Sequence, residues 1–410
     1  MTETTARLVL KPRKARPFFG RHPWVLDSAV ERVEGGPADG DVVELYSGRG
    51  EWIARGLYNG QSRIRLRLYT WRSDEPLDEQ FWRRRLQAAI DWRAALCDPS
   101  GQRAMRLVFS EGDGLSGLIV DRYGDYLVVQ FAALAIAQRA ELIVGLLVEL
   151  LHPRGVIVRY DRDIARLEGA RLEGARLEGL AGAVGDEVAW GEAPAGPAFI
   201  EEHGIRYGVD LSVGQKTGFF LDQRENRRVA AGYFRGRPVL DLFCYSGGFS
   251  LCASRLGGAV EVLGVDSSPK AIALAKANAE LNEVTNVRFE CGDAFRTLES
   301  LAAAGKRFGG IVLDPPKFAR RRQAVEEALR AYHKLNCMAL DVLEPGGVLV
   351  TCSCSGHVSR EDFLHTLADV AQRTGRDIQI LEQRGASPDH PTSATCLESE
   401  YLKCFVCRVG

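Results

Sequence analysis

The chain has 410 residues, enough for two or three domains that each bury a core of their own. Its hydrophobic content of 46% and charged content of 26% are ordinary for a globular protein. No apolar run approaches the roughly 18 residues of a membrane span, and residues 1–7 lack the apolar core of a signal peptide. The ten cysteines follow no regular spacing, which indicates reduced thiols in a cytoplasmic protein and no metal site.

Residues 1–72 are rich in glycine and in short apolar runs such as 42–45 and 52–57, which predicts a small β-barrel. The net charge of the chain is −1, but residues 1–71 hold 12 Lys and Arg against 8 Asp and Glu. Arg63, Arg65 and Arg67 alternate along a strand-like run, so their guanidinium groups would share one face. Such a face suits RNA phosphates, and a solvated sheet face explains it equally well. The candidate RNA contacts, which include two arginines from a later loop, are Arg13, Lys14, Arg21, Arg63, Arg65, Arg67, Arg320 and Arg321.

Residues 73–198 are interpreted as a middle α+β domain. The spacing predicts an amphipathic helix over residues 78–97, with Phe81, Leu86, Ile90 and Trp92 among charged positions. The pentapeptide Arg-Leu-Glu-Gly-Ala occupies residues 166–170, recurs at 171–175 and nearly recurs at 176–180. Three short copies cannot build a solenoid, so the repeat is interpreted as a loop expansion without catalytic meaning.

Residues 199–410 show a strong α/β pattern. Strand-like runs at 239–243, 262–266, 287–293, 311–314 and 348–351 alternate with helical segments such as 271–281. This alternation predicts a Rossmann-like, doubly wound parallel sheet. The runs 377–382 and 401–408 lack a convincing helix between them, and an antiparallel hairpin at the sheet edge is expected there.

The strand ends carry residues that favour S-adenosylmethionine as the cofactor. Gly247 and Gly248 let the backbone approach a ligand closely. Asp266 follows Asp241 by 25 residues and can hold a ribose diol, while Asp293 falls near an adenine position. Asp241 would repel the pyrophosphate of a dinucleotide and attract the ammonium of an amino acid.

Two loops at the same sheet edge indicate chemistry on a planar nitrogenous ring, with a cysteine as the attacking group. One reads Asp-Pro-Pro-Lys-Phe from Asp314, and the other reads Thr-Cys-Ser-Cys-Ser-Gly to Gly356. A thiolate that adds to such a ring makes a neighbouring carbon nucleophilic, and Asp314 can hydrogen-bond the ring. Cys352 and Cys354 would share one face of an extended strand. Cys354 is the preferred nucleophile because it comes later, where the strand opens into a loop. Cys352 is then a packing residue.

Nearly the whole chain resembles the ribosomal RNA large-subunit methyltransferase I type, S-adenosylmethionine-dependent enzymes that make 5-methylcytosine in 23S ribosomal RNA. The segments that carry the resemblance are residues 20–25, 117–125, 216–227, 314–318 and 353–356. The resemblance implies an RNA-binding PUA domain at residues 1–72, a middle domain at 73–198 and a class I methyltransferase domain at 199–410. The cofactor contacts that it implies are Phe220, Asp222, Arg224, Asp241, Phe243, Tyr245, Gly247, Asp266, Ser267, Asp293, Ala294 and Asp314.

The chain departs from other RNA cytosine methyltransferases at one position. Lys317 stands where they carry a second cysteine, so release by two cysteines is not expected. Lys317 is a candidate for contact with RNA phosphate, or it simply caps its loop. The base that removes the carbon 5 proton is not assigned.

Two alternatives stay open at this point. One is an RNA methyltransferase with another target, such as guanine N7, in which Cys354 would be a spectator. The other is an RNA-binding ribosome assembly factor without activity, and the intact set of strand-end carboxylates argues against it. The sequence leaves open the target nucleotide, the choice between naked RNA and an early ribosomal particle, and whether the protein forms a homodimer.

Overall fold

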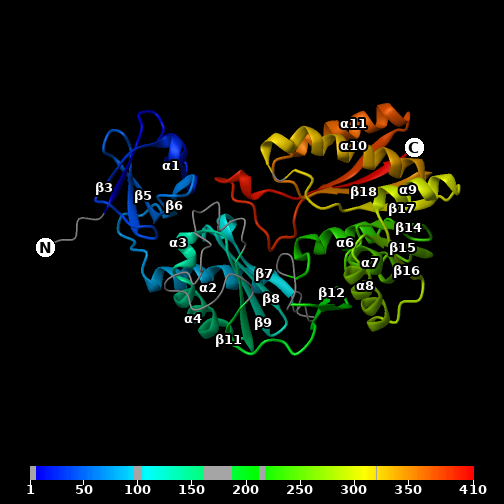
Figure 1. Cartoon of the computed structure of the whole chain (residues 1–410), viewed down its shortest axis with the longest axis horizontal. Helices are drawn as coiled ribbons and strands as arrows, with labels where there is room; N and C mark the ends of the chain where they lie inside the picture. Colours follow the sequence, from blue (N-terminus) through cyan, green and yellow to red (C-terminus); the bar gives the residue numbers. More distant parts are fainter. Residues whose placement is uncertain (1–5, 97–103, 161–186, 212–217, 320) are drawn as a thin grey trace. The chain divides into compact units, whose positions relative to one another are not determined.

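The computed structural model describes residues 6–96, 104–160, 187–211, 218–319 and 321–410 (Figure 1). The chain divides into two compact units. Unit 1 comprises Met1–Ala198, Asp210–Gly218 and Pro388–Ser399, and unit 2 comprises Phe199–Val209, Phe219–Ser387 and Glu400–Gly410. The repeat at 166–180 lies outside the described residues.

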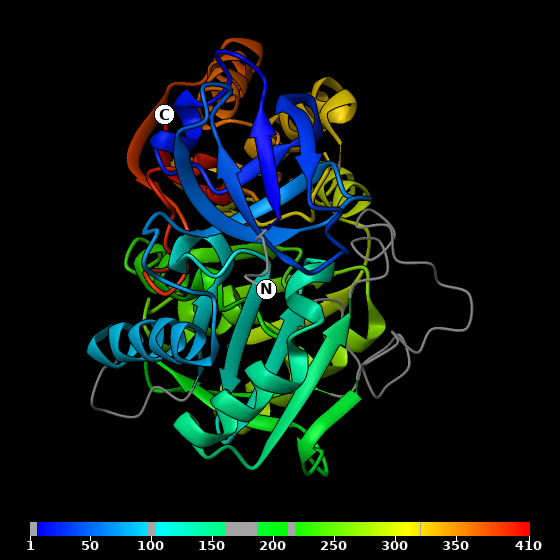
Figure 2. The same cartoon turned by 90° about the vertical axis from the view of Figure 1, so that its left-hand side faces the viewer.

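The N-terminal part of unit 1 is a six-stranded sheet in the order β2-β6-β5-β4-β1-β3. Its strands curve around an apolar core that includes Leu8, Leu45 and Leu66 (Figure 2). This confirms the prediction of a β-rich N-terminal domain. The elements are β1 Arg7–Leu10, α1 Arg16–Phe19, β2 Trp24–Leu26, β3 Val30–Glu34, β4 Val42–Tyr46, β5 Trp52–Tyr58 and β6 Ile64–Thr70.

The second part of unit 1 is a five-stranded sheet in the order β11-β10-β9-β8-β7, with α2 packed on β7 and on α4. Apolar residues of these helices and strands form one core. The elements are α2 Glu79–Leu96, β7 Ala104–Phe109, β8 Leu118–Tyr123, β9 Tyr126–Phe131, α3 Leu134–Ala137, α4 Ala140–Leu151, β10 Gly155–Tyr160 and β11 Glu187–Gly191.

The helix predicted at 78–97 is present as α2, but part of its predicted apolar face is wrong. Trp92 is 54% exposed, whereas the next residue, Arg93, is fully buried. The Arg93 guanidinium donates to both carboxylate oxygens of Asp113, at 2.5 and 2.8 Å, and to the carbonyls of Arg106 and Asp389. Burial of a charge is tolerated when every donor finds a partner, and here the partners come from distant parts of the sequence.

The arginines of residues 63–67 do not form one exposed face. Arg63 precedes β6 and is exposed, whereas Arg65 is half-buried and Arg67 is buried. The Arg67 guanidinium donates to the Ser116 hydroxyl at 3.2 Å and lies 3.6 Å from a Glu111 carboxylate oxygen. Because its charge is used inside unit 1, Arg67 is not available for RNA phosphate.

Unit 2 is built on a seven-stranded sheet in the order β16-β15-β14-β17-β18-β20-β19. The first five strands run parallel, and β20 pairs antiparallel with both β18 and β19. The α/β prediction and the antiparallel edge hairpin are therefore confirmed. The strands of this sheet are β14 Pro238–Leu242, β15 Glu261–Asp266, β16 Val287–Cys291, β17 Phe308–Leu313, β18 Leu343–Ser353, β19 Ile378–Arg384 and β20 Lys403–Val409.

Helices cover both faces of this sheet (Figure 1). One apolar core joins the sheet to α9, α10 and α11, and another joins it to α6 and α7. A small two-stranded sheet, β12 with β13, packs against α7 and α8. The bounds are β12 Ala198–Glu202, β13 Ile205–Val209, α6 Arg224–Ala231, α7 Gly248–Arg255, α8 Pro269–Leu281, α9 Ala294–Ala303, α10 Val325–Asp341 and α11 Arg360–Thr374. Among the described residues, no helix has the length and apolar character needed to cross a bilayer.

Arg93→Met tests the buried ion pair of α2. The substitution leaves the Asp113 carboxylate buried without its cation, so unit 1 should lose about 3–5 kcal/mol of unfolding free energy. Urea unfolding followed by tryptophan fluorescence measures this directly, because all six tryptophans lie in unit 1. Trp92→Phe, one residue away on the exposed side, is the matched control and should change stability by less than ~0.5 kcal/mol. A loss below ~1 kcal/mol for Arg93→Met would contradict the role given to this pair.

Candidate active site

The carboxyl ends of the central parallel strands bring three of the predicted acidic residues to one edge of the unit 2 sheet. Asp241 lies in β14, Asp266 ends β15, and Asp314 follows β17. β14 pairs with β15 on one side and with β17 on the other. The strand order reverses direction at β14, which is the place where open α/β sheets bind ligands.

Asp241 is the most unusual of these carboxylates. It is 1% exposed, and one of its oxygens, Oδ2, accepts from the backbone N–H and the hydroxyl of Ser250, at 2.9 and 2.6 Å. Its other oxygen, Oδ1, is buried and has no hydrogen-bond partner among the described residues. Burial, together with the charges of Asp314 and Asp266, raises the pKa of Asp241 to about 7. A buried acceptor with an open lone pair suits a cationic or hydrogen-bonding ligand.

The loop after β14 holds its backbone in a strained shape. Phe243 and Tyr245 have φ angles of 65° and 47°, in the left-handed region that bulky residues avoid. The Asp266 carboxylate accepts from the Tyr245 N–H at 3.0 Å and stabilises this shape. Gly247 has a φ of 82°, and a Cβ added there would lie 2.8 Å from the Phe289 ring. Strain of about 1–3 kcal/mol per residue is typical of loops shaped around a ligand.

Asp266 and Asp293 also fix neighbouring backbone. Asp266 accepts from the Ser268 N–H at 2.9 Å, and Asp293 caps α9 by accepting from the Arg296 N–H at 3.0 Å. Each carboxylate oxygen carries two lone pairs, so these bonds leave acceptor capacity for ligand hydroxyl and amino groups. Ser267 is exposed and Ala294 is buried beside these two carboxylates.

The segment before α6 contributes an aromatic ring and a buried ion pair. The Phe220 and Tyr245 rings meet edge to face at 5.2 Å. Arg227 pairs with Glu202 at 2.5 Å and donates to the Phe220 carbonyl at 2.9 Å, and both members of this pair are buried. Asp222 is buried and accepts from the Tyr401 hydroxyl at 2.5 Å. Arg224 is buried and lies 3.4 Å from Glu225. Arg227 ends the segment 216–227 that carries the resemblance, but no role was predicted for it.

The two candidate cysteines differ sharply in their surroundings. Cys352 is fully buried within β18 opposite Cys404 of β20. A hydrogen bond with Cys404 and burial raise the pKa of the Cys352 thiol well above its usual value. Cys354 follows the end of β18 and is half-buried, with its Sγ 3.8 Å from the Pro315 carbonyl. The structure therefore brings Cys354 to the loop that Asp314 begins, and keeps Cys352 in the core.

Lys403 is a residue of this region that sequence reasoning missed. It is 2% exposed and stands opposite Ser353 in the pairing of β20 with β18. Its ammonium donates to the carbonyls of Ser355 and Tyr401, at 2.7 and 2.8 Å. The signal was present in the sequence, because Lys403 interrupts an apolar strand between Leu402 and Cys404.

Ser355 joins the two loops of the candidate site. Its hydroxyl accepts from the Ala319 N–H at 3.2 Å and lies 3.1 Å from the Tyr332 hydroxyl. Tyr332 is fully buried in α10, and burial raises its pKa to about 12. These contacts fix the loop that carries Cys354 against the loop that carries Asp314.

The other predicted RNA contacts vary in exposure. Lys317 is exposed, and its ammonium lies 6.0 Å from the centre of the Tyr401 ring. Arg320 lies outside the described residues. The remaining exposed candidates are Arg13, Lys14, Arg21, Arg63 and Arg321.

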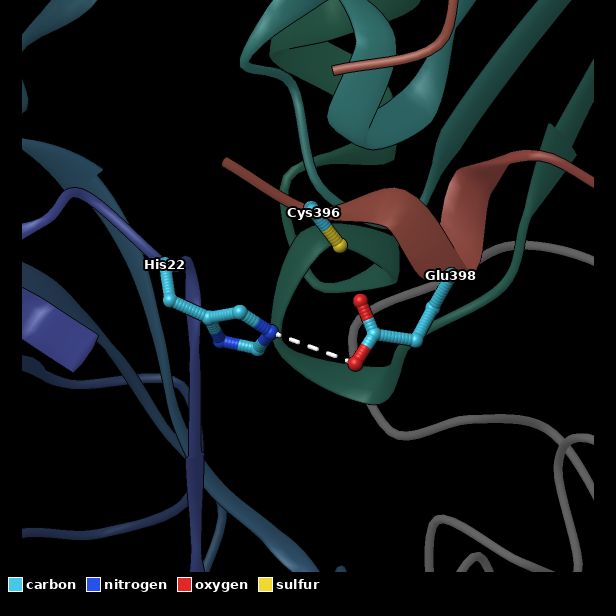
Figure 3. Close-up of side chains that lie close together, drawn as sticks. All are labelled: His22, Cys396 and Glu398. Carbon is cyan, nitrogen blue, oxygen red and sulfur yellow. Dashed lines mark ion pairs between the residues drawn. The ribbon is translucent and has the colours of Figure 1, made fainter. Parts of the chain in front are cut away.

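Unit 1 contains a second cluster of polar side chains, formed by His22, Cys396 and Glu398 (Figure 3). The His22 Nε2 lies 3.5 Å from a Glu398 oxygen, and its Nδ1 accepts from the Trp24 N–H at 3.2 Å. With Nδ1 accepting, Nε2 carries the proton and points it at Glu398, so it offers no lone pair to a metal. Burial and the charges of Glu111 and Glu398 raise the Cys396 pKa to about 12. The cluster is thus best described as a neutral imidazole that faces a carboxylate beside a neutral thiol.

Two protein-family models match the chain. A PUA-like domain matches residues 8–71, and an S-adenosylmethionine-dependent methyltransferase matches residues 187–401. Together they cover most of the N-terminal sheet and six of the seven strands of the sheet that carries the candidate site, since β20 begins after residue 401. The cofactor expected from the carboxylates and glycines of this site is therefore confirmed as S-adenosylmethionine.

Relatives extend the match to nearly the full chain. The Aeromonas hydrophila protein named ribosomal RNA large subunit methyltransferase I is 40% identical to this chain. The match covers 98% of this chain and 99% of the relative. The protein of that name in Serratia proteamaculans is also 40% identical, over 99% of this chain and 100% of the relative. A crystal structure of a methyltransferase complexed with SAH superposes with a TM-score of 0.83 at 23% identity, covering 98% of this chain and 99% of that one, which shows the shared fold. With these matches, the chain belongs to the ribosomal RNA large subunit methyltransferase I family of S-adenosylmethionine-dependent methyltransferases.

Proposed function

We propose that the protein methylates carbon 5 of a cytosine in 23S ribosomal RNA, with Cys354 as the covalent nucleophile. The single observation that carries the proposal is the placement of Cys354. It is the half-buried thiol at the end of β18, in contact with the loop that begins at Asp314. The names of the relatives and the PUA-like match support ribosomal RNA as the substrate.

The residues at the sheet edge fit the cofactor. Asp241 offers a buried carboxylate oxygen that suits the cofactor's ammonium group, and Gly247 lets the backbone come close. Asp266 and Asp293 retain acceptor capacity for ribose hydroxyls and the adenine amine. When bound, S-adenosylmethionine supplies an electrophilic methyl group.

The proposed chemistry begins with the thiolate of Cys354. Its electron pair forms a bond to carbon 6 of cytosine, and the electrons of the 5,6 double bond then make carbon 5 nucleophilic. After carbon 5 has gained the methyl group, a base removes its proton. The electrons of that C–H bond restore the double bond, and the sulfur leaves carbon 6 with its electron pair.

Asp314 is placed to assist this addition. Its carboxylate follows β17 on the same edge as Cys354, and its charge acts on both Asp241 and Tyr332. A carboxyl group that hydrogen-bonds the pyrimidine N3 or the exocyclic amine stabilises the charge that develops as sulfur adds. A protonated Asp314 would donate to N3, and an ionised one would accept from the amine.

Cys352 is a poor alternative nucleophile. It is fully buried, faces Cys404 across the sheet, and has a pKa raised well above the usual thiol value. The thiolate is the reactive form, so a thiol held neutral in the core is unsuited to attack. A packing role for Cys352 follows from its place among the apolar residues of that core.

The target base must leave any paired region to reach the thiol. Flipping costs a few kcal/mol and is cheapest in single-stranded or unfolded RNA. The exposed Lys317 and Arg321 lie on the chain directly after Asp314, and they suit contact with phosphates on either side of a flipped nucleotide.

Trapping with 5-fluorocytosine tests the nucleophile. Fluorine at carbon 5 cannot leave as a proton, so the bond between sulfur and carbon 6 persists. Wild-type protein incubated with S-adenosylmethionine and 5-fluorocytosine-containing 23S fragments should give a covalent adduct on denaturing gels. Cys354→Ala should abolish the adduct, whereas Cys352→Ala should retain it. These two variants are a matched pair, because one lacks the half-buried thiol of Cys354 and the other lacks the buried thiol of Cys352.

Other outcomes of this experiment are decisive as well. Loss of the adduct only in Cys352→Ala would move the role two residues upstream. Absence of any adduct, together with methyl transfer that survives both substitutions, would overturn the cytosine proposal. Methyl transfer to guanine would then be the function to test.

Cofactor affinity should depend on pH through Asp241. The folded pKa of about 7 lies above the usual value because the carboxyl is buried near Asp314 and Asp266. The ionised form attracts the cofactor's ammonium group, so affinity should rise as pH increases through 7. Calorimetric titration should give a Kd roughly tenfold weaker at pH 6 than at pH 8.

Asp241→Asn is the matched control for this titration. The amide keeps an oxygen that can accept from Ser250 but carries no charge at any pH. It should bind S-adenosylmethionine weakly at pH 8 and show little change between pH 6 and pH 8. A wild-type Kd that is independent of pH would contradict the role given to the Asp241 charge.

A further inference from the structure

We propose that Lys403 is a positioning residue for the Cys354 thiolate, which it stabilises as a buried cation while it fixes the loop that carries the thiol. This inference rests on the proposed function and adds to it the group that activates the nucleophile. Lys403 acts through the sulfur and through the backbone on either side.

The position of Lys403 follows from the strand register. β20 runs antiparallel to β18, with Cys404 opposite Cys352 and Lys403 opposite Ser353. The two carbonyls that hold its ammonium belong to Ser355, the residue after Cys354, and to Tyr401. The ammonium is therefore held beside the loop in which the thiol lies. Two of its three donors are used on carbonyls, and within the described ranges of the chain no carboxylate lies at hydrogen-bonding distance from it.

Electrostatics supports the pairing of this cation with the thiol. Burial lowers the pKa of Lys403 to about 8, and the charge of Cys354 acts in the opposite direction, raising it. Interaction between two titrating groups is mutual, so the Lys403 charge favours the thiolate of Cys354 to the same extent. Lys403 keeps its charge below its pKa, in the neutral range where the thiolate is needed.

The surrounding charges show why such a cation is needed. The charges of Cys354 and Asp314 both act on Tyr332 of α10, and an ionised Asp314 after β17 opposes thiolate formation. Glu400 also acts on Lys403, but its carboxylate is already bonded to Arg360 at 2.6 Å. Two other cations act on Lys403: Arg360, which is bonded to Glu400, and Lys317, which is exposed to solvent and therefore screened. Lys403 differs from both, because it is buried and its ammonium is held by two backbone carbonyls.

Three substitutions separate charge from structure. Lys403→Arg keeps the cation, Lys403→Gln keeps hydrogen-bond donors for the two carbonyls without a charge, and Lys403→Met removes both. A stabilised thiolate requires the charge, whereas a purely structural role requires only the donors. Calorimetric binding of S-adenosylmethionine by each variant checks that unit 2 remains folded.

The readout is alkylation of Cys354 by iodoacetamide, resolved by peptide mass spectrometry across pH 6 to 10. Only the thiolate reacts, so the rate reports its population. Wild-type Cys354 should titrate below the ~8.5 of a free thiol. At pH 7, Lys403→Gln and Lys403→Met should react about tenfold more slowly, equivalent to one pKa unit, and Lys403→Arg should stay within ~threefold of wild type. Exposed Cys291 in the same sample is the internal reference and should not change.

Several results would overturn the inference. One is a Lys403→Gln rate equal to that of wild type with a slow Lys403→Met, which would make the role structural. Another is an unchanged rate in all three variants. The test needs no RNA, so its outcome is independent of the trapping experiment. A normal adduct, together with a Cys354 alkylation rate that does not depend on the charge at residue 403, would refute this inference alone. A charge-dependent alkylation rate without any adduct would refute the cytosine reaction alone.

Discussion

The antiparallel pairing of β20 with β18 is the constraint on which the candidate site depends. Its register places Cys404 against Cys352 and Lys403 against Ser353. Side chains alternate between the faces of a strand, so a slip of one residue would exchange core and site positions along both strands. With this register Cys352 is buried in an apolar core. β18 ends at the next residue, so Cys354 lies in a loop. The same pairing places the buried ammonium of Lys403 where it donates to the carbonyl of Ser355 in that loop.

A second constraint is the burial of a carboxylate at the centre of the sheet. Asp241 satisfies one oxygen with Ser250, while Oδ1 has no partner among the described residues. The loop after β14 is strained at Phe243 and Tyr245, and Asp266 holds it. The unsatisfied buried oxygen disfavours the free protein, and a cationic ligand would supply the missing contact. The site therefore lowers the stability of the free protein and raises its affinity for the cofactor.

Periodicity was sufficient for the fold of unit 2, because parallel strands and their helices leave local patterns. The hairpin of β19 and β20 was predictable for the same reason, as was the gathering of Asp241, Asp266 and Asp314 at one edge. Buried charges were not predictable. Arg93 was not predicted to be buried, and Arg67 was a candidate for RNA contact or a solvated face. Their partners Asp113 and Glu111 lie 20 and 44 residues away in sequence. A local pattern cannot contain a partner that only the tertiary fold brings close.

The environment of Cys354 also bears on the absence of a second cysteine at Lys317. In the proposed reaction the sulfur must first attack carbon 6 and later leave it. A lower thiol pKa raises the thiolate population and improves the leaving group, but it weakens the nucleophile. The best compromise is a pKa near ambient pH, which a cation beside a half-buried thiol can set. Lys403 is such a cation, since its own charge is held by carbonyls rather than cancelled by a carboxylate. One tuned thiol can then serve both steps, and release needs no second sulfur.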